Sequence, residues 1–186
     1  MALGYADAVP TWLLDPDLPM IILSVMVVLV GLGLGAGDNL HYMLRTFNWR
    51  MLLLPLCTIV GTLLFSALGV LVLRGFSLTD CLAVGSGFGY YSLSSIFITE
   101  YKGAELGTIA LLANISREIL TLLAAPLLVR WFGNLAPISA GGATTMDTTL
   151  PIITRTAGQQ FVVVSIFHGF VADFSVPFLV TLFCSI

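Results

Sequence analysis

The chain contains very few charged residues. Of its 186 residues, seven are Lys or Arg and ten are Asp or Glu, so that 9% are charged while 58% are hydrophobic. A soluble domain carries about 25% charged residues. The composition therefore predicts an integral membrane protein. It also excludes nucleic-acid binding, because the basic residues are scattered singly and form no patch.

Cysteine is scarce as well. Cys57, Cys81 and Cys184 are odd in number and far apart, with no CxxC or Cys/His spacing. We therefore expect small core residues, with no metal site and no redox role. Residues 1–19 contain no Lys or Arg, which a cleavable signal peptide requires. We expect this segment to be an extracytoplasmic tail.

Long apolar runs are present instead. A bilayer core of about 30 Å requires about 20 helical residues. Runs of this kind predict four full transmembrane helices, at about 20–36, 51–73, 105–129 and 160–185. Nothing in the pattern suggests a barrel. The sequence thus predicts an all-α, multi-pass membrane protein in which residues 20–186 form a single transport domain.

Two stretches rich in Gly, Ser and Thr interrupt these runs, at about 79–99 and 139–153. A bilayer tolerates non-helical backbone only where protein or a water-filled cavity satisfies its polar groups. Paired broken segments beside an intramembrane charge are typical of a solute pathway. The residues that we expect in the two binding loops are Ser86, Gly87, Gly89, Tyr90, Tyr91, Ser92, Gly142, Thr144, Thr145 and Thr148.

The distribution of loop cations favours re-entrant segments over full crossings. Cytoplasmic loops carry an excess of Lys and Arg. If both broken stretches are re-entrant, four arginines share one side, and Arg74 and Lys102 lie on the other; the four are Arg45, Arg50, Arg130 and Arg155. We therefore predict two re-entrant segments that approach from opposite faces, with both termini outside.

The helix between these stretches carries charge near its middle. A central charge costs about 2.5–3.5 kcal/mol, so Glu118 must be neutral, paired or functional. Asn114 is four residues earlier and Thr121 three later, so all three share one helical face. We interpret Glu118, with Asn114 and Arg117, as a candidate substrate or proton site. The alternative is a structural Arg–Glu lock between helices.

Other polar positions leave alternatives open. Asp147 lies among four threonines, which fits a binding loop or a water-exposed loop equally well. His168 and Asp173, both in the last predicted span, are five residues apart and so not a natural pair on a helix. Each is a buried structural group or a proton relay, and we keep Arg155 as a further secondary candidate. Asp38 matches the GxGD pattern of intramembrane aspartyl proteases, but no second Tyr-Asp pair accompanies it.

Taken together, these motifs resemble the LysO-type lysine exporter family in order and spacing from about residue 20 onwards. The resemblance implies export of L-lysine and its toxic analogues across the cytoplasmic (inner) membrane, no enzymatic activity and no cofactor. It also implies an essential intramembrane glutamate, which falls on Glu118. The matching segments are Ser86–Ser94, Thr99-Glu100, Asn114, Arg117-Glu118, Gly142–Pro151, Arg155-Thr156 and His168–Phe170.

Two departures from the family stand out. Its members are longer, with further N-terminal spans that carry a second membrane-embedded aspartate, so the chain resembles the C-terminal portion alone. The resemblance then implies a separate small membrane subunit or a homo-oligomer. In addition, Asp173 stands where the family would have an apolar residue.

The mechanism expected from these features is proton antiport. Glu118, with Asp147, would neutralise an ammonium group of lysine, and backbone N–H groups of the broken segments would take its carboxylate. Protons at Glu118 would compete with the lysine cation. The open alternatives are export of another cationic or zwitterionic amino acid and a non-transporting membrane subunit. The second alternative would have polar stretches buried in protein with no cavity.

Overall fold

The computed structural model describes residue 25 and residues 49–73 and 75–186, which are helical with no strand in these ranges. Three helices are long and apolar enough to cross a membrane, at Met51–Leu71, Ala104–Phe132 and Gln159–Ser185. These coincide with three of the four predicted spans and confirm an all-α membrane protein. The predicted tail, Asp38 and, apart from residue 25, the first predicted span lie outside the described residues.

The long helices have clear sequence boundaries. Helix α4 (Trp49–Leu68) continues into the short 3-10 helix η2 (Gly69–Leu71). Helix α7 (Ala104–Phe132) starts after Gly103 and stops before Gly133, both of which have positive φ. Glycine is the residue that adopts such φ values without steric cost. Helix α10 (Val162–Ser185) follows the 3-10 turn η4 (Gln159–Phe161).

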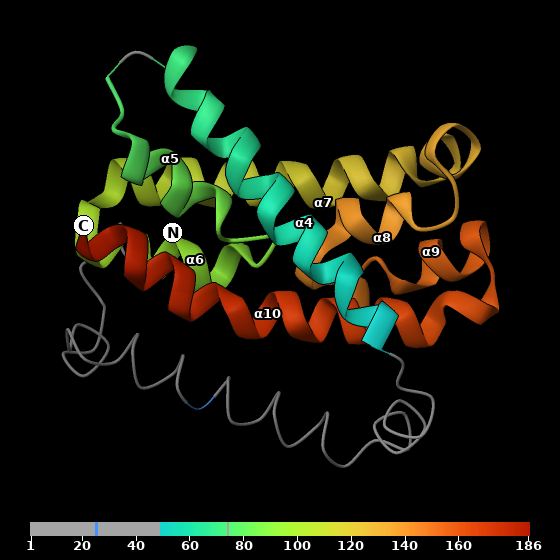
Figure 1. Cartoon of the computed structure of the whole chain (residues 1–186). Coiled ribbons are helices and arrows are strands. Elements are labelled where there is room, and N and C mark those ends of the chain that lie inside the picture. The colour runs from blue at the N-terminus through green and yellow to red at the C-terminus, as the bar shows by residue number, and fades with distance from the viewer. Residues whose placement is uncertain (1–24, 26–48, 74) are drawn as a thin grey trace, which may run out of the picture. The chain divides into compact units, whose positions relative to one another are not determined.

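The first interrupted stretch forms two short helices, α5 (Leu78–Gly85) and α6 (Tyr91–Lys102). A capping box starts α5, in which Ser77 and Asp80 exchange side-chain and backbone hydrogen bonds. The Lys102 ammonium, at the end of α6, lies 3.7 Å from the Asp80 carboxylate, in the first turn of α5. The start of α5 and the end of α6 therefore lie at the same end of the bundle. In Figure 1 both green helices lie at this end, and their connection points toward the middle.

The second interrupted stretch enters from the other end. Helix α8 (Ala136–Gly141) follows the end of α7, and the 3-10 helix η3 (Gly142–Met146) leads toward α9 (Leu150–Ala157). Figure 1 shows α8 and α9 at the end of the bundle opposite to α5 and α6. We call Ser86–Tyr90 the first tip and Gly142–Thr149 the second tip.

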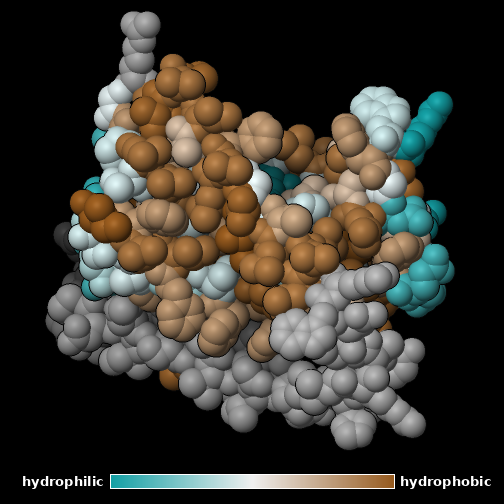
Figure 2. Space-filling view, in the orientation of Figure 1, coloured by the Kyte–Doolittle hydropathy of each residue, from teal (hydrophilic) through white to brown (hydrophobic). Residues whose placement is uncertain are grey.

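The outer surface is apolar and the interior contains small and polar residues. Leu53, Phe65 and Leu71 on the α4 side, and Phe174 and Phe178 on α10, are exposed large hydrophobic residues. Figure 2 shows apolar side chains over most of one face, with hydrophilic residues toward the ends of the bundle. A soluble protein rarely exposes apolar area on this scale. The surface therefore fits contact with lipid in a multi-pass membrane protein.

Candidate functional site

The two tips meet inside the bundle. The backbone N–H of Ala143 donates a hydrogen bond to the carbonyl oxygen of Phe88, with an N···O distance of 2.9 Å. Gly142 has φ +65°, and a Cβ there would collide with the same carbonyl. Phe88, itself at φ 45°, is fully buried. The junction therefore depends on a glycine at 142 and on backbone conformations that are unusual for other residues.

Asn114 on α7 holds the first tip. Its Oδ1 accepts a hydrogen bond from the Gly89 N–H at 2.7 Å, and its Nδ2 donates to the Ala110 carbonyl at 2.9 Å. Longer contacts reach the Val84 carbonyl at 3.4 Å and the Ser94 hydroxyl at 3.5 Å. The side chain is 4% exposed. An amide that supplies both donor and acceptor is thus used to satisfy broken backbone in the interior.

Arg117, three residues further along α7, holds the second broken segment. Its Nε donates to the Ala140 carbonyl at 2.7 Å and its Nη2 to the Ser139 carbonyl at 3.1 Å. Its Nη1 lies 3.5 Å from the Thr62 hydroxyl on α4. Successive turns of one helix therefore hold two chain breaks that enter from opposite ends.

Glu118 does not form the Arg–Glu lock that the sequence left open. It is half-buried and makes no hydrogen bond or ion pair with any described residue. Within the described ranges, the ion pair is Lys102 with Asp80. Asn114 and Thr121, its neighbours on the helical face, are both buried, and Thr121 donates to the Arg117 carbonyl at 2.9 Å.

His168 links the second tip to α4. Its Nδ1 lies 3.3 Å from the Thr145 hydroxyl and its Nε2 3.0 Å from the Thr58 hydroxyl. Thr58 continues the chain of contacts to Ser139 at 2.7 Å. The ring is fully buried, and Thr145 also reaches the carbonyls of Gly142 and Ser165. These contacts fit the structural alternative for this histidine.

Asp147 and Asp173 come together although they are distant in the sequence. Asp147 is exposed and accepts a hydrogen bond from the Thr148 N–H at 2.5 Å. It lies within electrostatic range of Asp173 on α10, and both carboxylates lie within such range of the Tyr90 hydroxyl at the end of the first tip. Residues from both tips and α10 thus share one region.

The remaining loop candidates have mainly local roles. Ser86 donates to the Ala83 carbonyl, and a Cβ at Gly87 would collide with Asn114. Tyr91 and Ser92 are half-buried in the first turn of α6, and Thr148 is exposed. Thr144 is buried against Gly141 and Thr149. Arg155 lies exposed in the last turn of α9, outside this arrangement.

The first tip has no spare backbone donors for a substrate carboxylate. Each N–H from Ser86 to Tyr91 donates a hydrogen bond within the chain, five to carbonyl oxygens and that of Gly89 to Asn114. In this conformation the tip therefore does not provide the backbone anion site that we expected from the sequence.

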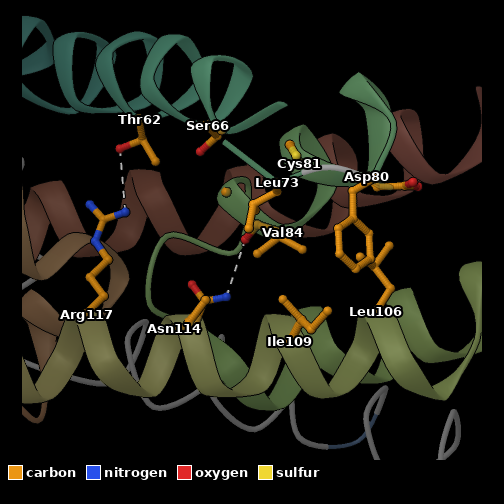
Figure 3. Close-up of a pocket in the computed structure, with 14 residues that line it drawn as sticks. Thr62, Ser66, Leu73, Asp80, Cys81, Val84, Leu106, Ile109, Asn114 and Arg117 are labelled. Carbon is orange, nitrogen blue, oxygen red and sulfur yellow. Dashed lines mark hydrogen bonds between the residues drawn. The ribbon is translucent and has the colours of Figure 1, made fainter. Parts of the chain in front are cut away.

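A cavity of about 250 Å³ lies beside Asn114 and Arg117, between α4, α5 and α7. Figure 3 shows Arg117 pointing toward Thr62, Asn114 pointing toward α5, and Asp80 far along the cavity from Arg117. Sequence reasoning missed the wall formed by α4 and η2, which includes Thr62, Ser66 and Gly69. Their spacing of three or four residues was a signal for a polar helical face. This signal was easy to overlook in the sequence, because these small residues hardly lower the mean hydropathy of the span.

Comparison with known proteins yields a consistent result. The family model described as "Lysine exporter LysO" matches residues 1–184. The chain is 32% identical over 161 residues to "Lysine exporter LysO" of Escherichia coli, covering 87% of this chain and 53% of that protein. It is 41% identical over 108 residues to a "Putative lysine exporter" of Haemophilus influenzae, covering 58% of this chain and 55% of the relative. The chain thus spans about half the length of these curated relatives. No solved structure matches.

Proposed function

Because the chain belongs to the lysine exporter LysO family, we propose that it forms a membrane-embedded transport unit that exports L-lysine and its toxic analogues from the cytoplasm. The family resemblance drawn from the sequence motifs is confirmed by the match over residues 1–184. The substrate, its direction of movement and the coupling ion remain part of the proposal. We propose that this transport involves no enzymatic step and no organic cofactor.

The observation that carries the proposal is the meeting of two broken segments at the middle of α7. Ala143 contacts Phe88 across the junction, while Asn114 and Arg117 hold the two segments from one helix. Discontinuous helices that meet near the bilayer midplane are typical of secondary transporters. We propose that both segments are re-entrant, from opposite membrane faces, and that small movements at the junction open the site alternately to each side.

Two carboxylates are proposed to handle the cationic charge of the substrate. Glu118 is near the middle of α7 and has no partner among the described residues, which leaves it free to bind an ammonium group or a proton. Asp147 is exposed on the second tip, beside Asp173. Competition between a proton and the lysine cation at Glu118 would couple export to proton entry, so protons are the proposed coupling ion.

The cavity beside the junction favours transport over a purely structural subunit. A non-transporting scaffold would have its polar stretches buried with no space beside them. Here Asn114 and Arg117 both line a cavity of about 250 Å³. This volume is slightly below the roughly 300 Å³ at which pockets for drug-sized ligands begin. It therefore suits a ligand smaller than a drug, such as an amino acid. Export of another cationic or zwitterionic amino acid is the second candidate, since no residue that lines the cavity is specific for the lysine side chain.

The length of the chain suggests a partner. Since it spans about half of its curated relatives, we propose that a second small membrane subunit with the family's N-terminal spans completes the exporter. Self-association is the alternative. The exposed apolar residues of α4, α7 and α10 offer surface for either arrangement or for lipid.

The test is counterflow of radiolabelled lysine in proteoliposomes, with the chain alone and with the product of a neighbouring short gene. We expect lysine exchange from the wild type and its loss in Glu118→Gln. The matched control is Glu105→Gln, because Glu105 is exposed in the first turn of the same helix. Wild-type exchange by Glu118→Gln would refute the role of this carboxylate. Absence of lysine exchange in both wild-type preparations would refute the proposed function.

A further inference from the structure

Arg117 is half-buried on α7, and its guanidinium has no counter-ion among the described residues. Its three hydrogen-bond partners are the neutral oxygens of Ser139, Ala140 and Thr62. No carboxylate of the described residues lies within ion-pair distance of it. A cation taken out of water is costly unless an opposite charge or strong hydrogen bonds compensate it. Carbonyl oxygens supply part of this compensation and leave the net charge in place.

The guanidinium also retains hydrogen-bonding capacity on its cavity side. Arginine has five N–H donors in a planar fork, and the shorter bonds at 2.7 and 3.1 Å use Nε and Nη2. Nη1 makes the longest contact, 3.5 Å to the hydroxyl of Thr62, and both residues line the cavity. Figure 3 shows this side of the guanidinium turned toward α4. A carboxylate placed there would meet a cation and a hydroxyl donor together.

We propose that the cavity between α4, α5 and α7 is the subsite for the α-carboxylate of an amino acid with an aliphatic side chain, and that Arg117 binds this carboxylate. The inference rests on the proposed function and identifies one half of its binding site. It replaces the backbone donors of the first tip, which are all occupied within the chain.

The walls of the cavity fit the rest of such a molecule. Apolar side chains of Val84, Leu106 and Ile109 line it between Arg117 and Asp80. These surfaces can cover the methylene groups of a substrate whose carboxylate is at Arg117. Asp80 belongs to the same lining at the far end, where its carboxylate is already paired with the Lys102 ammonium.

The test uses isothermal titration to compare the binding of lysine and of lysinamide, which lacks the carboxylate, to the purified chain in nanodiscs, alone and with the product of the neighbouring short gene. A charge-assisted hydrogen bond contributes about 1.5–3 kcal/mol, so we expect the wild type to prefer lysine by about 10- to 100-fold. Arg117→Gln should lower lysine affinity to that of lysinamide while leaving lysinamide affinity unchanged. Arg130→Gln, in the last turn of the same helix, is the matched control and should retain the preference.

Several outcomes would overturn the inference. Equal wild-type affinity for lysine and lysinamide would do so even if Arg117→Gln failed to fold. If a folded Arg117→Gln lost affinity for lysine and lysinamide equally, the role of the arginine would be structural. Filling the cavity with Ala113→Phe should weaken the binding of both ligands, and unchanged binding would place the subsite elsewhere. Absence of lysine binding by the wild type, both alone and with the product of the neighbouring short gene, would refute the proposed function itself. That result is distinct from lysine binding that does not depend on Arg117.

Discussion

Removal of the Asn114 side chain should loosen the first tip in a way that can be measured residue by residue. In Asn114→Ala the Gly89 N–H loses its acceptor at 2.7 Å, in a place where both residues are buried. A buried donor left without a partner costs about 1–3 kcal/mol. The Ala110 carbonyl loses a contact at 2.9 Å, but as a helical carbonyl it keeps its place in the backbone ladder. The unpaired Gly89 N–H therefore accounts for most of the expected loss of local stability.

The assay is amide hydrogen exchange followed by mass spectrometry on peptides that cover residues 86–91. A local destabilisation of about 1.4 kcal/mol or more would raise exchange of the Gly89 amide at least about tenfold. Ser116→Ala is the control, because Ser116 is exposed on the same helix. Peptides from α9 should show no change. Equal protection of the first tip in Asn114→Ala and Ser116→Ala would refute the argument that this side chain holds the tip.

Two further predictions concern the ends of the bundle and the link to α4. Burial raises the pKa of Asp80, but hydrogen bonds from Ser77 and the Lys102 charge outweigh it and leave the pKa lowered. The stabilisation by this carboxylate is therefore present at neutral pH and lost as pH falls through the lowered pKa. Lys102→Met should reduce thermal stability at pH 7 and have less effect at a pH below the lowered pKa of Asp80, where the carboxylate is protonated; equal losses at both pH values would contradict this. His168→Leu and Thr58→Val should be coupled by about 0.5–3 kcal/mol in a double-mutant cycle of unfolding, and simple additivity would count against the observed contact.

Local sequence features predicted the long helices and the places where helices break. The spans at 51–73, 105–129 and 160–185 follow from apolar runs of sufficient length. That Gly103 and Gly133 bound α7 with positive φ is a finding of the structure. The Gly- and Ser-rich stretches identified the tips because glycine permits the conformations that a break requires. These features depend on neighbouring residues alone and are therefore readable without a structure.

The partners of the site could not be predicted in the same way. Arg117 binds carbonyls of Ser139 and Ala140, and every residue has a carbonyl, so no sequence signal marks such an acceptor. Asp80 and Lys102 were separated by 22 positions, and their contact depends on the reversal of the chain between α5 and α6. Interactions of this kind become visible only when distant segments are placed together in three dimensions.

If the junction of the two tips is the transport site, substitution of Gly142 should abolish transport. Gly142 and Gly133 both have positive φ, at +65° and +89°, so an alanine at either position suffers backbone strain. Only at Gly142 does the added Cβ collide with the Phe88 carbonyl, whereas nothing lies within 4 Å at Gly133. The measurement is lysine counterflow by the two variants in proteoliposomes, each checked for monodispersity. We predict that Gly142→Ala loses exchange while Gly133→Ala retains it, and equal exchange by both would contradict the account.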